Sequence, residues 1–353
     1  MAYATISKPS LHMNTNLYTG NDADNRGITG IGFQPDWVWL KKRNATAGGA
    51  IFDALRGAGK VIYPSENNAQ GNESASFVSF DSDGYTISQD AGVGLNVNND
   101  TYVGWNWKAN GQGSSNTDGS INTTYTSVNT TAGFSISTWT GTGANATVGH
   151  GLGVKPEMII VKNYSAAQNW CVYHSGLGGT EGHKALYLDL NYNEVDQTGF
   201  WNDTAATSSV FSVGTNTNTN GSGASMIAYC FAPKKGYSKF GSFTGNENAN
   251  GPFVYTGFKP AFVLAKNASI NDWWSMYDNK RLGFNSSDSP RLLFPDATSA
   301  ESTSKMLDFT SNGFKIKNSN TGINGNGNTT IYMAFAEEPL VANVGGSIPA
   351  TAV

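Results

Sequence analysis

Two short segments combine aromatic rings with amide and carboxylate side chains, the groups with which proteins bind sugars. They are Trp201-Asn202-Asp203 and Asp272-Trp273. An indole is a large flat apolar surface that can stack on a sugar ring, while Asn and Asp can hydrogen-bond its hydroxyls. The sequence therefore predicts a glycan site at Trp201, Asn202, Asp203, Asp272 and Trp273. Packing of both tryptophans in or beside the core is the competing interpretation.

Paired carboxylates would support a second chemistry, the hydrolysis of glycosidic bonds. That reaction needs two acids about 5 to 10 Å apart in a cleft. Neighbouring strands could bring together Asp53 with Asp81, or Asp189 with Glu194. Their spacing does not distinguish them from other acids, so the sequence predicts no catalytic residue. A polysaccharide depolymerase remains the weaker alternative.

The sequence predicts neither a metal ion nor a cofactor. Cys171 and Cys230 lie in apolar runs without metal-ligand spacing around them, which predicts two buried free thiols, with a single disulfide as the alternative. Residues 81–84 share two acids with a calcium loop but lack its later ligands. Residues 149–153 are glycine-rich, but the helix that a phosphate-binding loop requires is not predicted after them.

The elements that would position these residues occur three times. Two independent markers recur, an aromatic-Thr-Gly turn and a proline that opens an apolar strand ending in lysine. The glycine of the turn is Gly20, Gly141 and Gly245, and the proline is Pro35, Pro156 and Pro260. Both markers recur with the same steps of 121 and 104 residues. A third marker, an acid or histidine after an aromatic residue, recurs at Asp53, His174 and Asp278. We therefore expect His174 to have a hydrogen-bonding role in the fold.

The pattern of short apolar runs predicts an all-β chain. The runs are rich in Val, Ile, Phe, Tyr, Trp and Thr and are separated by Gly, Asn and Asp. We predict three tandem repeats of antiparallel β-sandwich or jelly-roll-like modules, which are residues 12–110, 133–236 and 237–340, with a Gly/Ser/Asn/Thr-rich linker at 111–132 and a C-terminal tail at 341–353. The runs 216–223 and 318–328 are predicted as long hairpin loops. Whether the repeats are separate domains or one merged architecture stays open.

Composition excludes several classes of partner. The net charge is −4 and only 14% of residues are charged, which argues against nucleic acid because phosphate binding needs clustered Lys and Arg. We expect no membrane insertion, since no run approaches the roughly 20 apolar residues that span a bilayer. Residues 1–10 have neither a basic nor an apolar region, so no signal peptide is expected.

Several longer motifs resemble a known group of proteins. They are residues 32–37 (GFQPDW), 141–152 (GTGANATVGHGL), 228–232 (AYCFA), 251–258 (GPFVYTGF) and 334–339 (AFAEEP). As a set they resemble repetitive β-rich proteins encoded by marine bacteriophages, often grouped with virion and tail-associated proteins. The resemblance covers residues 12–345. It implies a lectin-like sandwich fold and a place on the virion surface, and it supplies no catalytic residue.

The combined expectation is a non-enzymatic virion surface protein, made in the host cytoplasm and associated with a tail or fibre. There it would bind a host receptor or a surface glycan. The alternative is a capsid decoration protein or head fibre with a purely structural role. Expected partners are other virion proteins, to which residues 341–353 could dock, with self-assembly into a homotrimer left open.

Overall fold

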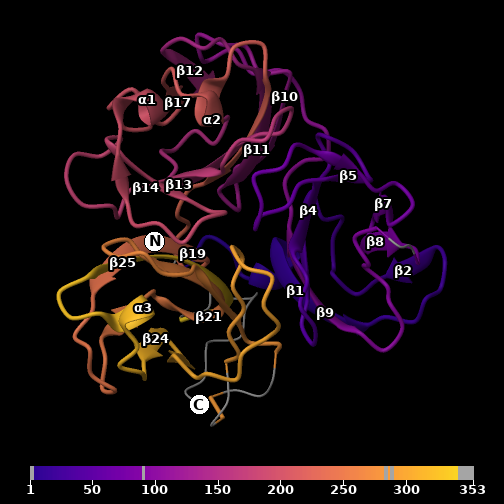
Figure 1. Ribbon diagram of the computed structural model, residues 1–353, viewed down its shortest axis with the longest axis vertical. Coiled ribbons are helices and arrows are strands. Elements are labelled where there is room, and N and C mark those ends of the chain that lie inside the picture. The colour runs from indigo at the N-terminus through magenta and orange to yellow at the C-terminus, as the bar shows by residue number, and fades with distance from the viewer. Residues whose placement is uncertain (1–3, 90–91, 282–284, 287–289, 341–353) are drawn as a thin grey trace.

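The computed structural model describes residues 4–89, 92–281, 285–286 and 290–340, and the chain folds as an all-β protein (Figure 1). The predicted tail, 341–353, lies outside the described residues. Among these residues no helix has the length and hydropathy that crossing a membrane requires. The named strands pair antiparallel throughout, as the short alternating apolar runs predict.

Each repeat contributes a similar succession of elements. The first contains η1 (Pro9–Leu11), β1 (Met13–Thr19), β2 (Arg26–Ile28), β3 (Trp37–Lys42), β4 (Gly49–Asp53), β5 (Lys60–Val61), β6 (Gly71–Asn72), β7 (Phe77–Asp81), β8 (Gly84–Ile87) and β9 (Thr101–Trp107). The second contains β10 (Tyr125–Asn129), β11 (Phe134–Thr140), β12 (Ala146–Gly149), β13 (Met158–Asn163), β14 (Cys171–His174), β15 (Lys184–Tyr187), β16 (Val195–Asp196), α1 (Thr198–Trp201), β17 (Val210–Val213), α2 (Thr217–Asn220) and β18 (Ser225–Phe231). The third contains β19 (Ser238–Thr244), β20 (Phe253–Tyr255), β21 (Phe258–Asn267), β22 (Ser275–Asp278), β23 (Leu307–Thr310), β24 (Gly313–Ile316), α3 (Thr321–Asn324) and β25 (Thr329–Pro339).

The same strand order recurs in three main sheets. The orders are β1-β9-β3-β4, β11-β18-β13-β14 and β19-β25-β21-β22, the second being the centre of a seven-stranded sheet that β10, β15 and β16 extend. The proline-led strands β3, β13 and β21 therefore lie inside their sheets, which explains why their sequences are almost continuously apolar. A smaller sheet accompanies each main sheet, with the orders β2-β8-β7, β12-β17 and β20-β24-β23.

Side chains on opposite faces of each main sheet enter different cores. In β3, Trp37 and Trp39 belong to a central hydrophobic cluster, whereas Val38 and Leu40 belong to a cluster of the first repeat alone. All three repeats contribute to the central cluster, and Figure 1 shows the three lobes arranged around it. Ring contacts join each pair of repeats, with centroid distances of 4.7 Å for Trp37–Tyr229, 5.6 Å for Trp107–Phe262 and 6.2 Å for Phe231–Phe335. The repeats thus pack against one another through a shared core.

Hydrogen bonds also join the repeats in a closed ring. The residue at the end of each of β4, β14 and β22 forms a hydrogen bond with the neighbouring repeat. The three contacts are Tyr229 Oη to Asp53 Oδ2 (2.8 Å), Trp105 Nε1 to Asp278 Oδ2 (3.0 Å) and His174 Nε2 with the Tyr332 carbonyl (3.1 Å). The His174 ring accepts the Gly176 amide at Nδ1, which leaves Nε2 as the donor. The prediction that His174 has a hydrogen-bonding role is therefore confirmed.

The lysines that end the proline-led strands also connect each repeat to its neighbour, in the same cyclic order. Each is buried and donates to a backbone carbonyl of the neighbouring repeat: Lys41 to Ala297 (2.8 Å), Lys162 to Asn67 (2.8 Å) and Lys266 to Asn191 (3.4 Å). Because burial disfavours the charged form, the pKa of each ammonium falls to about 8.

The segment 111–132, which the sequence predicts as a linker, is partly in β-structure. That segment contains β10, which pairs along its length with β11, and Ser114 bridges to Thr126. Its Gly, Ser, Asn and Thr content resembles a flexible connector, but Thr126 and Ser127 are buried against the second sheet. Cys171 and Cys230 are buried free thiols, as predicted.

A buried asparagine explains the aromatic-Thr-Gly marker. Its side-chain oxygen accepts the amide after the glycine in every repeat, with partners Asn96–Asn21, Asn220–Thr142 and Asn324–Asn246. A side chain on the glycine would collide with the backbone carbonyl after this asparagine, at 1.9 Å for Gly20, 2.2 Å for Gly141 and 2.3 Å for Gly245. Glycine is required there by the close approach of two backbone segments.

We expect Asn96→Ala to lower the free energy of unfolding by about 1–3 kcal/mol, because the fully buried Asn96 side chain makes hydrogen bonds that alanine cannot replace. Its amide donates to Asn21 and to the Ala23 carbonyl, and its oxygen also accepts from Arg26. Urea unfolding would measure the change. The control is Asn98→Ala, an exposed amide two residues away that should shift the value by less than about 0.5 kcal/mol. Equal losses of unfolding free energy in the two variants would contradict the structural role assigned to Asn96.

Candidate ligand site

The structure separates the two predicted segments and gives them different roles. Trp201 ends α1 and is 1% exposed, with its ring packed edge-on against Tyr173 at 5.8 Å. Asn202 and Asp203 follow in the left-handed conformation, and Asp203 accepts the Thr198 hydroxyl. Trp201 therefore cannot offer a face to a sugar, and its packing interpretation is the correct one.

The second predicted segment lies in an exposed loop between β21 and β22. Trp273 is 42% exposed, and its ring lies 6.4 Å from that of Phe294. The Asp272 carboxylate accepts the Trp273 amide at 2.7 Å, which fixes the loop at the point where the indole leaves the surface. Trp274, one residue further, is buried and donates its indole N–H to the Tyr187 carbonyl.

Asp272 and Trp273 stand at the rim of a cavity of about 160 Å³. Its apolar part comes from Leu292, Phe294, Met306 and Ile323, and its polar part from Asp272, Ser275, Tyr277 and Asn320. An apolar base with a few convergent polar groups is the usual composition of a small-ligand site.

The hydroxyl of Tyr277 is the most informative polar group in this cavity. Tyr277 is fully buried, yet its hydroxyl has no hydrogen-bond partner in the part of the chain that the structure describes. Ser275 is the polar side chain beside it, and it lowers the pKa of Tyr277 against the larger effect of burial. Burial raises the pKa of Tyr277 well above its usual value, so this hydroxyl is a protonated donor. A ligand hydroxyl would supply the missing acceptor.

Asn320 and Gly322 are site residues that the sequence analysis missed. Gly322 lies in α3, and Asn320 precedes this helix and caps it, its side chain accepting the Gly322 amide at 2.8 Å. A side chain at Gly322 would come within 2.4 Å of the Asp272 carboxylate, so glycine keeps the wall of the cavity close to the rim. The runs 216–223 and 318–328 are predicted as long hairpin loops, but each contains a short helix, α2 and α3, and the asparagine that caps each helix is the signal that could have shown it.

A comparison with protein families assigns residues 8–339 to one family. A family model described as a domain of unknown function, DUF7483, matches residues 8–339. The chain belongs to the DUF7483 family. No curated protein and no solved structure matches it. The match extends over all three repeats.

The repeats of this DUF7483 chain provide an internal control for the site. The steps of 121 and 104 residues place Gly48 and Asn169 where the third repeat has Trp273. The neighbouring Trp274, by contrast, corresponds to the buried Trp170 of the second repeat. The fold thus forms equivalent loops without an indole at this position, so packing does not require the ring of Trp273.

The acids considered for glycoside hydrolysis have bonds within the DUF7483 fold. Asp53 forms a buried ion pair with Arg56 at 2.6 Å, and Glu194 pairs with Lys184. Asp81 accepts the hydroxyls of Ser79 and Thr86, both at 2.7 Å. No cluster of three metal-binding His, Cys, Asp or Glu side chains occurs among the residues that the structure describes.

Proposed function

We propose that this DUF7483 chain is a non-enzymatic carbohydrate-binding protein of a virion surface, and that the Asp272–Trp273 cavity holds one sugar residue. The observation that carries the proposal is the exposed Trp273 indole beside a cavity with an apolar base and several polar side chains. The indole would stack on the sugar ring, and Tyr277, Asp272 and Asn320 would bond its hydroxyls.

The resemblance to phage virion and tail-associated proteins supports the location. A tail or fibre is the position from which a glycan site would contact a host surface, and other virion proteins would be its partners. Antibody–gold labelling of intact particles tests this part. Label at the tail or fibre tips supports host recognition, and particles without label would contradict the virion proposal.

A purely structural virion role is the second candidate, because tryptophan serves mainly to build the core. Eight of the nine tryptophans are less than 2% exposed, and Trp273 alone among the nine is accessible. A capsid decoration protein or head fibre would need this rigid three-lobed body without a ligand. Label over the particle head and no binding to any glycan would favour that role.

We expect Trp273→Ala to weaken glycan binding by about 5- to 30-fold, which corresponds to the loss of 1–2 kcal/mol of stacking. Binding would be measured on immobilised mono- and polysaccharides, and the polysaccharide chain length afterwards would report any depolymerase activity. The control is Tyr192→Ala, which removes an aromatic ring of similar exposure, 49%, that does not line the cavity.

Tyr277→Phe separates ligand binding from folding. Its hydroxyl makes no hydrogen bond within the described chain, so the variant should keep the stability of the parent protein while binding sugar more weakly. Unchanged binding in both the Trp273 and Tyr277 variants would remove this cavity from the proposal. Shortened polysaccharide after incubation would overturn the non-enzymatic assignment.

A further inference from the structure

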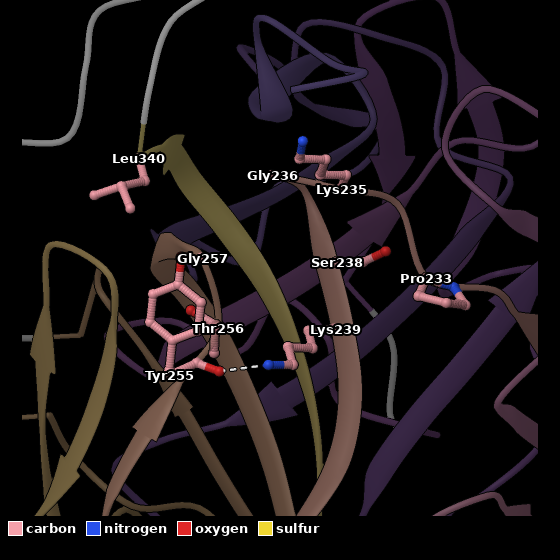
Figure 2. Close-up of a pocket in the computed structure, with 9 residues that line it drawn as sticks. All are labelled: Pro233, Lys235, Gly236, Ser238, Lys239, Tyr255, Thr256, Gly257 and Leu340. Carbon is pink, nitrogen blue, oxygen red and sulfur yellow. Dashed lines mark hydrogen bonds between the residues drawn. The ribbon is translucent and has the colours of Figure 1, made fainter. Parts of the chain in front are cut away.

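A second and larger cavity lies at the opposite end of the third repeat's strands from the first loop. Its volume is about 520 Å³, and it is formed where β19 begins, where β20 turns into β21 and where β25 ends. Figure 2 shows the ring of Tyr255 on one side, Lys239 beside it, and Lys235 and Leu340 around the open space. Pro233, Ser238 and the Gly236 and Gly257 backbones complete the lining.

The aromatic rings at this place are not required by the fold. β20 is an edge strand, and its residues Phe253 and Tyr255 are 47% and 52% exposed, while Val254 between them is buried. Val254 pairs with Phe314 as Ile28 pairs with Tyr85 and Val148 with Phe211. This register places Gly27 and Thr147 at the position of Phe253, and Thr29 and Gly149 at the position of Tyr255. The other two repeats thus form the same strand without exposed rings.

Positive charge gathers beside the exposed ring. Lys234, Lys235 and Lys239 lie within six positions in a chain that has only 22 lysine and arginine residues. The Lys239 ammonium donates to the Tyr255 carbonyl at 2.6 Å and lies 5.4 Å from the centre of its ring, so ring and charge are held together (Figure 2). Glu157 is the acid that faces Lys239, and the lysines of this stretch outnumber it.

We propose that this cavity binds a sugar residue that carries a carboxylate or sulfate group, within an acidic polysaccharide. The exposed part of the Tyr255 ring stacks on the sugar, and the ammonium groups of Lys235 and Lys239 attract its anionic group. This combination of ring and cations differs from the Asp272–Trp273 cavity, whose rim carries a carboxylate. The two sites are independent, so either can fail without the other.

The test measures binding of the full chain to three probes: a polyuronate, dextran sulfate and neutral dextran. We expect binding to at least one anionic probe, with Tyr255→Ala weakening it about 5- to 30-fold. The variant is compatible with the fold because the second repeat has Gly149 at that position. A preference for the polyuronate assigns the anionic group as carboxylate, and a preference for dextran sulfate assigns it as sulfate.

Salt dependence and a matched control separate a site from general attraction. The double variant Lys235→Gln/Lys239→Gln should bind about tenfold more weakly and lose most of its salt dependence. The control Lys8→Gln, at an exposed lysine outside the cavity, and Trp273→Ala should bind the anionic probe as the parent does. Equal binding of Tyr255→Ala and the parent, equal loss in the Lys8 control, or no preference over neutral dextran would overturn the proposal.

Discussion

Replacement of Asp278 by alanine is expected to lower the free energy of unfolding by about 3–5 kcal/mol, the usual effect of breaking a buried ion pair from one side. Asp278 and Arg281 are both fully buried and bonded at 2.6 Å. The same carboxylate oxygen accepts the indole N–H of Trp105, from the first repeat, at 3.0 Å. The variant would leave a buried guanidinium short of a counter-ion and an indole N–H without its acceptor, at the contact between two repeats.

Urea unfolding followed by tryptophan fluorescence would measure this loss, with the midpoint compared at equal slope. Asp24→Ala is the control, because Asp24 is an exposed carboxylate whose removal should change stability by less than about 0.5 kcal/mol. Arg281 also contacts Glu301 at 3.3 Å. A loss below 1 kcal/mol for Asp278→Ala would therefore show that Glu301 is sufficient as the counter-ion.

The strands were predictable because local pattern determines them. The proline-led runs are almost continuously apolar because one face enters the central cluster and the other enters the core of its own repeat, as Trp37 and Val38 do. The Thr-Gly marker was visible for an equally local reason, the contact of Gly20 with a neighbouring backbone. In each case the composition of a single segment was enough to predict its local structure.

The relations between repeats were not predictable, because they depend on pairs far apart in the chain. Asp53 and Tyr229 are 176 residues apart, and Trp105 and Asp278 are 173 apart. A single sequence holds no signal for such pairs beyond the acids and aromatics themselves. The repeat pattern alone therefore left open whether the three units were separate, and it gave no reason to expect a shared core.

The same dependence on distant contacts explains why the sequence could not tell which tryptophan belongs to the candidate site. Trp201 and Trp273 have similar neighbours in the sequence, an Asn or Asp on one side and a second aromatic residue on the other. Burial separates them, because Trp201 packs on Tyr173 whereas the loop of Trp273 projects beyond its sheet. Alignment of the repeats with one another was the usable signal. It showed Gly48 and Asn169 in place of Trp273. Such an alignment distinguishes side chains that the fold requires from side chains that the other repeats fold without.

Raising the pH from 7 to 9 is expected to stabilise the protein, which is the reverse of ordinary alkaline behaviour. Burial lowers the pKa of Lys41, Lys162 and Lys266 from 10.5 to about 8, so between these values the unfolded chain binds more protons than the folded one. Stability therefore rises with pH in this window and is lost as pH falls through 8. Each lysine contributes about 1 kcal/mol between pH 7 and 9, at 1.36 kcal/mol per pKa unit.

Other buried groups lower the stability as the pH rises, and they set the pH above which stability no longer increases. Burial raises the pKa of the Cys171 and Cys230 thiols and of tyrosines such as Tyr229, so their unfolded forms lose protons first, above about pH 8.5 for thiols and 10 for tyrosine. The three lysines outweigh two thiols up to pH 9, and the tyrosines reverse the trend above pH 10.

The lysines themselves can be tested one at a time in the same pH series. Lys41→Met should remove about a third of the lysine contribution, because its ammonium no longer titrates. The charged groups that act on Lys41 besides burial are Asp296, which raises its pKa, and Arg281, which lowers it. Lys8→Met, at an exposed lysine, should leave the slope of stability against pH unchanged. A parent protein whose stability falls steadily from pH 7 to 9 would show that the three lysines keep an ordinary pKa, and that the ring of lysine-to-carbonyl contacts between the repeats is hydrated.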